Sequence, residues 1–404
     1  MGVHKIEEIS LLDKMNQTQR SMPEMRILHL MRHVRSTDGG PTRALIDLVA
    51  VMTARGHSVG VLSADFEDSG LDSSNLIPLD VASETWGLLR RTCRDSVRRN
   101  IASADIVHLH LPWDPLNIQV ARMAREAGVP YCVSLRGTLD DWCMRQKSVK
   151  KRLYMALFAR SLLEQASFVH CTAAEEMRQS QVWYPRGRSV VIPNLLDLAP
   201  FRRLSGPELA RRHFKLAADV PVILFLSRIH EKKGLHHLLR ALPILGARHP
   251  VARVLIAGDG DISYVRSMRE LASTAPKGYR VEFVGHVSGD LKLSLLEAAD
   301  CFVLPSSQEN FGFALFEAAL TGTPIVVTNL VDTWRELESG ASATIVRQDP
   351  RSIATGITTS LERTAGTARD RHAASSKKWA TSYLDTSSIA AQFEAAYRGA
   401  ITAP

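Results

Sequence analysis

Short apolar runs alternate with amphipathic stretches along most of this 404-residue chain. The apolar runs are rich in Val, Ile and Leu and are bounded by turn-forming residues, which is typical of buried strands. In the longer stretches between them the apolar residues recur every three or four positions, which predicts helices with one buried face. This alternation is typical of βαβ units with parallel sheets, so the predicted fold class is α/β.

The first half of the chain contains one complete set of these elements. A turn at Gly39 and Gly40 follows the first apolar run and precedes a helical stretch that Gly56 ends. We predict strands at residues 25–30, 58–62, 105–109, 131–135, 168–171 and 190–192, and helices at 42–55, 117–127 and 147–165.

A segment with several Pro and Gly residues, 195–219, separates the halves, and we predict the domain linker there. The pattern then restarts. We predict strands at 222–226, 253–257, 281–284, 301–304 and 324–327, and a last helix at 376–400.

These elements predict a flexible tail over residues 1–24, a first domain over 25–205 and a second over 206–375. Each domain is expected to hold a Rossmann-like, doubly wound sheet. A ligand is then expected in the cleft between them, at the carboxyl ends of the strands.

Composition narrows the class of partner. Lys and Arg number 50 and Asp and Glu 42, a formal charge of +8, which favours anionic ligands such as nucleotides or phospholipid head groups. Dense basic runs of the kind found in nucleic-acid binders are missing, so we expect no nucleic-acid partner. The five cysteines form no C-x-x-C pair, which argues against a zinc site or disulfide framework and fits the cytoplasm. No apolar run approaches the ~18 residues that span a bilayer, and the first 24 residues lack the pattern of a secretory signal.

The stretch from Cys301 to Glu317 holds the most informative residues. A predicted strand leads into a polar loop, and a helix is expected to begin near Phe311 or Gly312. Free backbone N–H groups at that helix start can hold a phosphate or a sugar oxygen. Glu309 in the loop and Glu317 in the helix can accept hydrogen bonds from vicinal hydroxyls. The alternative is that both are solvated surface glutamates, but the apolar neighbours of Glu317 make an exposed face difficult to arrange.

A second stretch follows the first strand of the second half. Arg228 and Lys233 lie in a strand-to-helix loop, where two cations can clamp a pyrophosphate. An ordinary basic loop is the alternative. Lys232 is adjacent to Lys233, and of the two lysines it is the one that can be solvated. Gly39 and Gly40 can bring backbone amides to a phosphate, although a tight turn explains them equally well.

In this order, the motifs resemble glycosyltransferase family 4, also called group 1. The resemblance rests on Arg228 with Lys233, Glu309-Asn-Phe-Gly, the E-x7-E spacing to Glu317, and Gly322-Thr-Pro-Ile-Val-Val. The early Gly39-Gly40 and the run Ile106-Val-His-Leu-His110 fit as well, so it covers about residues 26 to 400. It implies the GT-B fold, nucleotide-activated sugars, retention of configuration and no catalytic metal or bound cofactor.

The resemblance also implies roles for individual residues. Arg228 and Lys233 match the pair that binds the donor diphosphate, Glu309 the acid that holds donor sugar hydroxyls, and Glu317 the acid that binds the ribose. It further implies that the amides of Asn310, Phe311 and Gly312 cover the sugar and phosphates.

In the first half, His110 matches a histidine beside the donor sugar, and Gly40 a glycine near the diphosphate. The helix at 376–400 is implied to cross back to the first domain.

The function implied is transfer of a hexose from a UDP- or GDP-sugar to a saccharide or a lipid-linked saccharide, in the manner of bacterial polysaccharide enzymes. A non-catalytic nucleotide-sugar-binding subunit is the rival from another class, and the intact motif residues argue against it. A UDP-sugar epimerase should lack the E-x7-E pair. A metal-dependent transferase would use Asp259 and Asp261, but their place after a strand favours a Gly-rich turn.

Two features leave alternatives open. Many family members carry a histidine where this chain has Arg136, and this arginine can form a structural ion pair or bind the acceptor. Two basic clusters in the first half, Arg90–Arg99 and Arg145–Arg152, can be solvated helix faces or can contact an anionic membrane such as the inner face of the plasma membrane.

Overall fold

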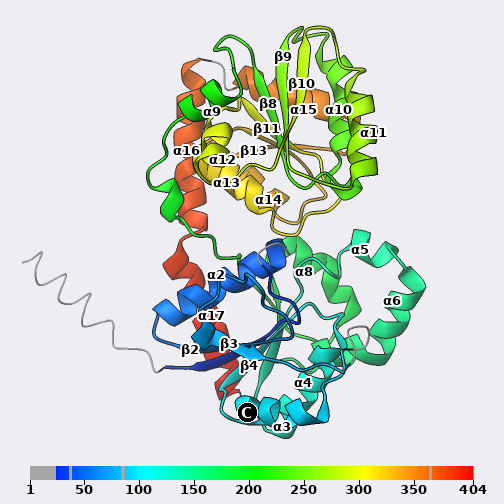
Figure 1. The fold of residues 1–404 in the computed structure, drawn as a ribbon, viewed down its shortest axis with the longest axis vertical. Helices are drawn as coiled ribbons and strands as arrows, with labels where there is room; N and C mark the ends of the chain where they lie inside the picture. Colours follow the sequence, from blue (N-terminus) through cyan, green and yellow to red (C-terminus); the bar gives the residue numbers. More distant parts are fainter. Residues whose placement is uncertain (1–23, 36–38, 83–86, 364–365, 404) are drawn as a thin grey trace, which may run out of the picture.

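The structure is a computed structural model, and it describes residues 24–35, 39–82, 87–363 and 366–403. Two α/β domains are stacked along the long axis of the molecule (Figure 1). The predicted tail over residues 1–24 lies outside the described residues except for Glu24.

The first domain is built around a seven-stranded parallel sheet of order β3-β2-β1-β4-β5-β6-β7. Its strands are β1 Arg26–Leu30, β2 Ser58–Ser63, β3 Leu76–Pro78, β4 Ile106–His110, β5 Tyr131–Ser134, β6 Phe168–Cys171 and β7 Ser189–Val191. Its helices are α2 Gly40–Ala54, α3 Arg91–Ala102, α4 Pro115–Glu126, α5 Asp141–Arg145, α6 Ser148–Tyr154, α7 Arg160–Glu164 and α8 Ala174–Ser180.

The second domain repeats this plan with a six-stranded sheet of order β10-β9-β8-β11-β12-β13. Its strands are β8 Val222–Leu226, β9 Ala252–Ala257, β10 Tyr279–Gly285, β11 Cys301–Leu304, β12 Ile325–Thr328 and β13 Ala343–Val346. Its helices are α9 Glu208–His213, α10 Leu235–Leu245, α11 Ile262–Ala272, α12 Gly289–Ala298, α13 Phe313–Thr321, α14 Trp334–Ser339, α15 Pro350–Arg363 and α16 Thr367–Tyr383. A last helix, α17 Thr386–Thr402, returns to the first domain.

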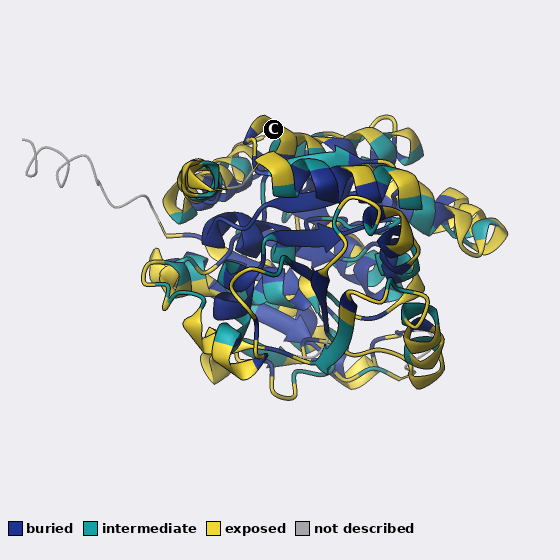
Figure 2. Ribbon diagram, turned by 90° about the horizontal axis from the view of Figure 1, so that it is seen from above, coloured by how far each residue is buried: buried dark blue, intermediate teal, exposed yellow. Residues whose placement is uncertain are grey.

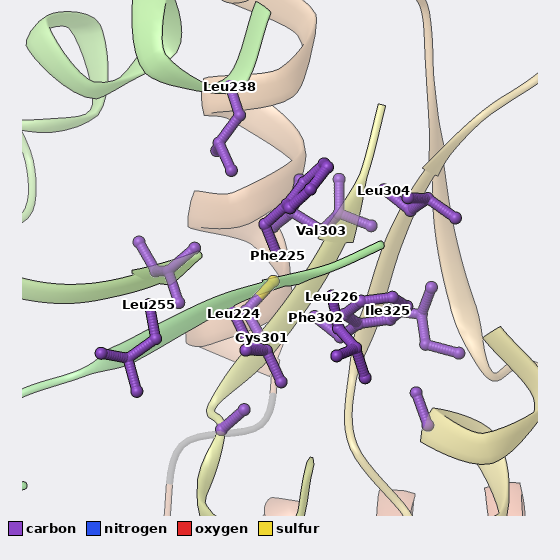
Figure 3. Close-up of a cluster of buried hydrophobic side chains, with 14 of the residues drawn as sticks. Leu224, Phe225, Leu226, Leu238, Leu255, Cys301, Phe302, Val303, Leu304 and Ile325 are labelled. Carbon is purple, nitrogen blue, oxygen red and sulfur yellow. The ribbon is translucent and has the colours of Figure 1, made fainter. Parts of the chain in front are cut away.

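Helices cover both faces of each sheet, which explains why the strands read as continuous apolar runs rather than alternating ones. β8 and β11 are buried along their whole length, and their side chains form the centre of the second core (Figure 3). Figure 2 shows the same layering from above, with buried strands inside and the exposed helix faces outside. In both sheets the strand order reverses beside the first strand, β1 or β8, and this is where open α/β sheets bind ligands.

The structure corrects two predictions about elements and adds two strands. The single helix expected at 376–400 is two helices, because Asp385 interrupts the run and its carboxylate accepts a bond from the Ser388 N–H at 2.8 Å. Helix α9 lies inside the predicted linker, where Ala210 N–H binds the Ser294 hydroxyl of the second domain. The edge strands β3 and β13 were not predicted, since both are short and only partly buried.

The two terminal helices join the domains. Tyr383 of α16 stacks on Phe316 of α13 at 5.4 Å between ring centroids, whereas Phe393 and Tyr397 of α17 are buried in the first domain. Figure 1 shows α16 beside the second domain and α17 beside the first. No helix among the described residues is long and apolar enough to cross a membrane.

Candidate functional site

A cavity of about 400 Å³ lies between the two domains, at the carboxyl ends of β8 and β11, and we call it the interdomain cleft. It brings together most of the residues that the sequence pointed to. Of the predicted site residues, those that line it are Gly40, Arg228, Lys233, Glu309, Asn310, Phe311 and Gly312.

The loop after β8 supplies two cations to this cleft. Arg228 follows the strand and is exposed, while Lys233 closes a 3-10 turn and pairs through its Nζ with Oε2 of Glu309. Gly234 comes next with φ +70, and a Cβ there would overlap the carbonyl oxygen of Pro305. The two loops that carry Lys233 and Glu309 are therefore in direct contact, and this contact requires glycine.

The loop after β11 supplies the acid and the backbone. Phe311 is buried against Phe316, with ring centroids 4.4 Å apart, and this anchors the loop. Asn310 donates from Nδ2 to Asp332 at 3.2 Å. Gly312 has φ +76 and precedes α13 without a side-chain cap, so the first N–H groups of that helix stay available to a ligand.

Glu317 does not line the cleft. Its side chain is buried in α13, where Oε1 accepts bonds from Arg43 of α2 at 2.8 Å and from Lys292 of α12 at 3.0 Å. The alternative in which Glu317 is a solvated surface glutamate is therefore wrong. The carboxylate is enclosed between the domains, and Arg43 reaches it from the opposite domain.

The beginning of α2 forms the first-domain side of the cleft. Gly39 occupies the N-cap position with φ +86 and has no side-chain cap bond, and Pro41 follows inside the first turn. A Cβ on Gly40 would lie 3.8 Å from the Phe313 ring of the second domain, so Gly40 faces α13 directly.

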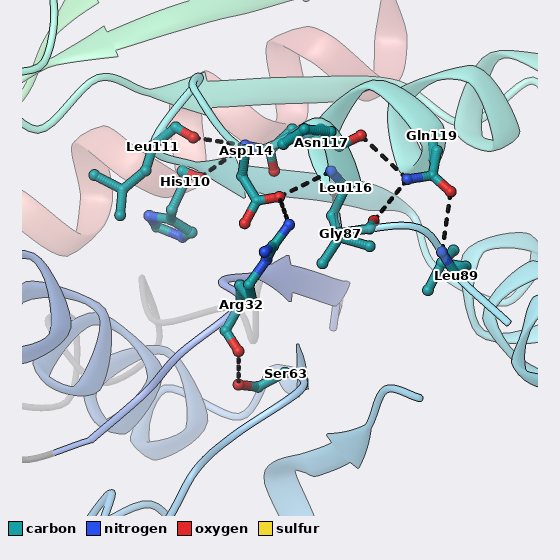
Figure 4. Close-up of polar contacts among 11 residues, drawn as sticks. Arg32, Ser63, Gly87, Leu89, His110, Leu111, Asp114, Leu116, Asn117 and Gln119 are labelled. Atoms are coloured by element: carbon teal, nitrogen blue, oxygen red, sulfur yellow. Dashed lines mark hydrogen bonds and ion pairs between the residues drawn. The ribbon is translucent and has the colours of Figure 1, made fainter. Parts of the chain in front are cut away.

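His110 lies in a different cavity, of about 920 Å³, within the first domain. The two cavities share Pro41 in their lining. At the end of β4 the Asn117 side chain donates to the carbonyl oxygens of His110 and Leu111, which fixes the backbone there (Figure 4). The Nε2 of His110 lies 3.1 Å from Nδ1 of His29. The Nδ1 of His110 has no hydrogen-bond partner among the described residues.

Four histidines form a buried group at this edge of the first sheet. Burial lowers the pKa of His29 and of His170 to about 3, and it lowers the pKa of His108 and His110 well below the usual range. All four are therefore neutral at pH 7.

Nitrogen atoms of His29, His108 and His110 lie close enough together to hold a metal ion. However, both ring nitrogens of His108 already have partners, the Tyr397 hydroxyl at 2.7 Å and the Ser134 hydroxyl at 2.7 Å. A metal bound by all three would have to displace one of these hydrogen bonds.

Asp259 and Asp261 make hydrogen bonds within a turn, which the sequence favoured over a metal site. Asp261 caps α11, accepting from the Ser263 N–H at 2.9 Å and the Tyr264 N–H at 3.0 Å. The carbonyl of Asp259 accepts from the Ile229 N–H at 2.8 Å.

Side chains beyond the motif residues also join the domains at the cleft. Lys232, expected to be solvated, lies with its Nζ 5.1 Å from the centroid of the Trp142 ring. Gln179 donates to Asp332 across the domains at 3.1 Å. Burial, with the Glu176 charge as the next cause, raises the pKa of Asp332 well above its usual range.

The sequence reasoning did not find Arg43 or Lys292, the partners of Glu317. Arg43 had a weak signal, because a cation in the first turn of a helix opposes the helix dipole and needs another reason to be there. Lys292 had none, since its contact with Glu317 arises only when α12 and α13 pack together.

Comparison with known proteins agrees with this geometry. The model for glycosyl transferases group 1 matches residues 208–379, and the model for the glycosyl transferase 4-like domain matches residues 39–195. This chain belongs to the group 1 glycosyltransferases. The two matched segments coincide with the two domains and lie on either side of the cleft.

The curated proteins that this chain resembles carry different names, as three of them show. An uncharacterised glycosyltransferase of Methanocaldococcus jannaschii is 33% identical over 63% of this chain and 65% of that protein. Glycogen synthase of Mycobacterium tuberculosis is 30% identical over 71% of this chain and 66% of that protein. The chain thus spans slightly less than two thirds of each. A phosphatidyl-myo-inositol mannosyltransferase of M. tuberculosis is 26% identical over 92% of this chain and 96% of that protein.

Solved structures show the fold. The complex of Anabaena HepE with UDP and glucose matches with a TM-score of 0.70 at 21% identity, covering 92% of this chain and 99% of that one. WaaG, a glycosyltransferase involved in lipopolysaccharide biosynthesis, matches with a TM-score of 0.65 at 17% identity, covering 94% and 100%. The predicted GT-B architecture, two Rossmann-like domains facing across a cleft, is confirmed.

Proposed function

We propose that this chain is a retaining glycosyltransferase that moves a hexose from a UDP- or GDP-sugar to a hydroxyl of a saccharide or lipid-linked saccharide, without a catalytic metal. The observation that carries the proposal is the contact of Lys233 with Glu309 in the interdomain cleft. A cation for the diphosphate and an acid for the sugar hydroxyls are thereby adjacent, as a nucleotide-sugar requires.

The charge of the cleft supports an anionic donor. Among the described lining residues, the cations are Arg136, Arg228, Lys232 and Lys233, and the acid is Glu309. In a cavity that excludes water, fixed cations stabilise the negative charge that develops on a leaving diphosphate more strongly than in solution.

The chemistry needs no protein base. The bond between the sugar anomeric carbon and the diphosphate oxygen breaks, and the acceptor hydroxyl oxygen bonds to that carbon on the same face. The hydroxyl proton passes to the leaving phosphate oxygen, so charge and atoms balance. Arg228 and Lys233 hold the leaving group, Glu309 orients the sugar, and His110, neutral in its buried site, offers its Nδ1 to a hydroxyl.

The comparisons support a nucleotide-sugar donor and a lipid-linked acceptor. HepE has been solved with UDP and glucose, and one relative is named as a mannosyltransferase of phosphatidyl-myo-inositol. The first is printed with glucose and the second with mannosyl transfer, so the two differ in sugar, and the choice between UDP and GDP belongs to the experiment below.

A surface on the first domain favours an acceptor held at an anionic membrane. Helix α6 and the π-helical turn after it, Met155–Ala159, expose a group of apolar side chains: Val149 81%, Leu153 59%, Leu157 60% and Phe158 46%. The chain has no acidic residue between Asp141 and Glu164, and the basic cluster Arg145–Arg152 lies in this segment. Exposed apolar residues among cations are typical of a helix that lies on an anionic lipid surface.

This surface is connected to the cavity that holds His110. Phe158 contacts Tyr154 at 5.5 Å between ring centroids, and Tyr154 contacts Trp113 at 5.6 Å. Trp113 lines the 920 Å³ cavity. An acceptor anchored in a bilayer would therefore enter the cavity beside the surface that contacts the lipid.

The donor is tested by thermal shift and slow hydrolysis against UDP-, GDP-, ADP- and CDP-sugars, with and without EDTA. We expect one nucleotide class to stabilise the protein, and the effect to be lost in Lys233→Ala and Glu309→Ala. Lys277→Ala, an exposed lysine of the same domain, is the matched control. Binding without any turnover, with or without saccharide acceptors, would support the non-catalytic alternative, and loss of turnover in EDTA would contradict metal independence.

The membrane contact is tested by co-sedimentation with vesicles of phosphatidylcholine alone or mixed with phosphatidylglycerol. We expect binding only to the anionic vesicles, at least tenfold weaker in Leu153→Ser/Leu157→Ser. The matched control is Arg94→Glu/Arg98→Glu on α3, where the apolar residues are buried. If the control loses as much binding as the α6 variant, the contact depends on overall charge and the proposed surface is wrong.

A further inference from the structure

Arg136 carries a buried guanidinium whose hydrogen bonds are mostly unmade. It follows β5, is 7% exposed and donates from Nη1 to Oδ1 of Asn194. Its Nε and Nη2 have no partner among the described residues. Burial lowers its pKa to about 10, so the group remains charged at neutral pH.

The guanidinium also lacks a carboxylate partner within the described chain. Glu176 is near, but its two oxygens already accept from the Gly137 N–H at 2.6 Å and from the Thr172 N–H at 2.6 Å. A structural ion pair, one of the two roles that the sequence left open, is therefore not formed. A buried charge without a counter-charge carries a desolvation penalty that a bound anion would offset.

The beginning of α2 lies on the same cleft wall. Gly39, Gly40, Pro41 and Arg136 all line the interdomain cleft. Helix α2 is 15 residues long, has no side-chain cap bond and has no acidic residue in its first turn. Its free N–H groups and its dipole favour an anion at the point where Arg136 also supplies donors.

The turn that carries Arg136 touches the loop that carries Glu309. A Cβ on Gly137 would overlap Cβ of Asn310 and would lie 2.9 Å from Nε2 of Gln308. Arg136 and Gly137 thus line the cleft where the turn of the first domain contacts the loop of the second, and a ligand group bound there would be partly shielded from water. Shielding strengthens a charge-assisted hydrogen bond.

We propose that Arg136 and the first turn of α2 bind a phosphate or carboxylate group of a ligand from the first-domain side of the cleft. This proposal rests on the proposed function for its account of Arg228 and Lys233, which hold the donor diphosphate from the second domain. The anionic group has two sources that share one chemistry: an acidic or phosphorylated acceptor saccharide, or the donor diphosphate itself. The planar guanidinium suits either group, because it can bind two oxygens at once.

The test is calorimetric titration of the full chain and of Arg136→Gln with UDP, GDP and pyrophosphate. A second titration, with the better nucleotide present at saturation, compares glucose with glucose 6-phosphate. Arg186→Gln, an 82% exposed arginine of the same domain, is the matched control. Far-UV circular dichroism and a melting curve establish that each variant is folded.

At least tenfold weaker binding of UDP, GDP or pyrophosphate in Arg136→Gln supports the proposal and identifies the donor as the source. A tenfold loss of affinity for glucose 6-phosphate alone, with the affinity for glucose unchanged, also supports the proposal and identifies the acceptor as the source of the anionic group. If Arg136→Gln does not fold, Arg136→Lys replaces it, and we expect a loss of several-fold because an ammonium binds one oxygen rather than two.

Equal affinities of wild type and variant for every anion, or no binding of any anion by the wild type, would overturn the proposal. A different result would contradict the proposed function. In that case no nucleoside diphosphate binds to the wild type, and Lys233→Ala therefore changes nothing. Phosphate binding that depends on Arg136 would still stand in that case.

Discussion

The guanidinium of Arg43 in the first domain donates a hydrogen bond of 2.8 Å to the buried carboxylate of Glu317 in the second. The same guanidinium lies 4.7 Å from the centroid of the Phe313 ring. Arg43 is thus bound to α13 by both charge and aromatic contact. Because α13 begins directly after the loop of Glu309, this pair connects the domain arrangement to the donor side of the cleft.

We expect Arg43→Met to loosen the contact between the domains. Glu317 keeps Lys292 as a partner, so the loss of stability should be about 1 kcal/mol or less, as for a partly exposed ion pair. The radius of gyration measured by small-angle X-ray scattering without ligand should increase. Arg122→Met, which removes an exposed pair within α4, is the control. An unchanged radius of gyration would mean that other contacts alone hold the domains together.

We expect Gly234→Ala to destabilise the second domain more than its backbone angle accounts for. A Cβ at Gly234 would overlap the Pro305 carbonyl, whereas Gly128, with nearly the same φ of +69, has nothing within 4 Å. Gly128→Ala should therefore cost only the left-handed backbone penalty of about 1–2 kcal/mol. Gly234→Ala should cost at least about 2 kcal/mol more, because two loops must separate. Urea unfolding measures both, and equal losses would contradict the close approach.

We expect stability to fall as the pH decreases below about 6.5. The pKa of His29 and of His170 in the folded state is about 3, so the folded protein stays unprotonated while the unfolded chain takes up protons. The stability is fully present above pH 6.5 and is lost progressively toward pH 3, by up to about 1.4 kcal/mol per pH unit for each histidine.

Urea unfolding at pH 5, 6, 7 and 8 tests this, with His170→Asn as the variant. The variant should show a smaller dependence of stability on pH between 5 and 6.5, whatever its stability at pH 8. His213→Asn is the control, because this histidine is exposed at the end of α9 in the second domain. If the dependence of stability on pH is unchanged in His170→Asn, this histidine takes up its proton in the folded state as readily as in the unfolded chain.

We expect the first domain to depend on the last helix of the chain. Phe393 is 2% exposed and contacts the His170 ring at 5.0 Å between centroids. Phe393→Ala should cost about 3–5 kcal/mol, as for other large buried aromatic residues. Ile401→Ala on the same helix, where the side chain is 37% exposed, should change stability by less than about 0.5 kcal/mol. Differential scanning calorimetry measures both, and similar melting curves for the two variants would mean that α17 is not part of this core.

Much of the fold follows from local pattern. The runs at Val222–Leu226 and Cys301–Leu304 are long enough and apolar enough to predict buried parallel strands, and both are strands of the second sheet. The short edge strands were missed for the opposite reason. Leu76–Pro78 is only partly buried and ends in proline, so neither hydrophobicity nor length distinguishes it from a loop.

The motif residues of the site were predictable because charged side chains directly follow predicted strands in the sequence. Arg228, Lys233 and Glu309 all follow strands that lie side by side, so the topology alone brings them to one edge of the sheet. The sequence therefore determined the α/β class, the family resemblance and the loops that supply the cleft.

Only the tertiary structure decided which distant groups meet. Glu317 is paired with Arg43 across 274 positions of sequence, His110 lies in a separate cavity, and Arg136 is buried without a carboxylate. Apart from the weak signal at Arg43, none of these facts has a local signal in the sequence. The pairing of Glu317 depends on how the two domains pack, and the place of His110 depends on how the first domain packs. Burial sets the charge state and the missing partners of these side chains through the cost of removing polar groups from water.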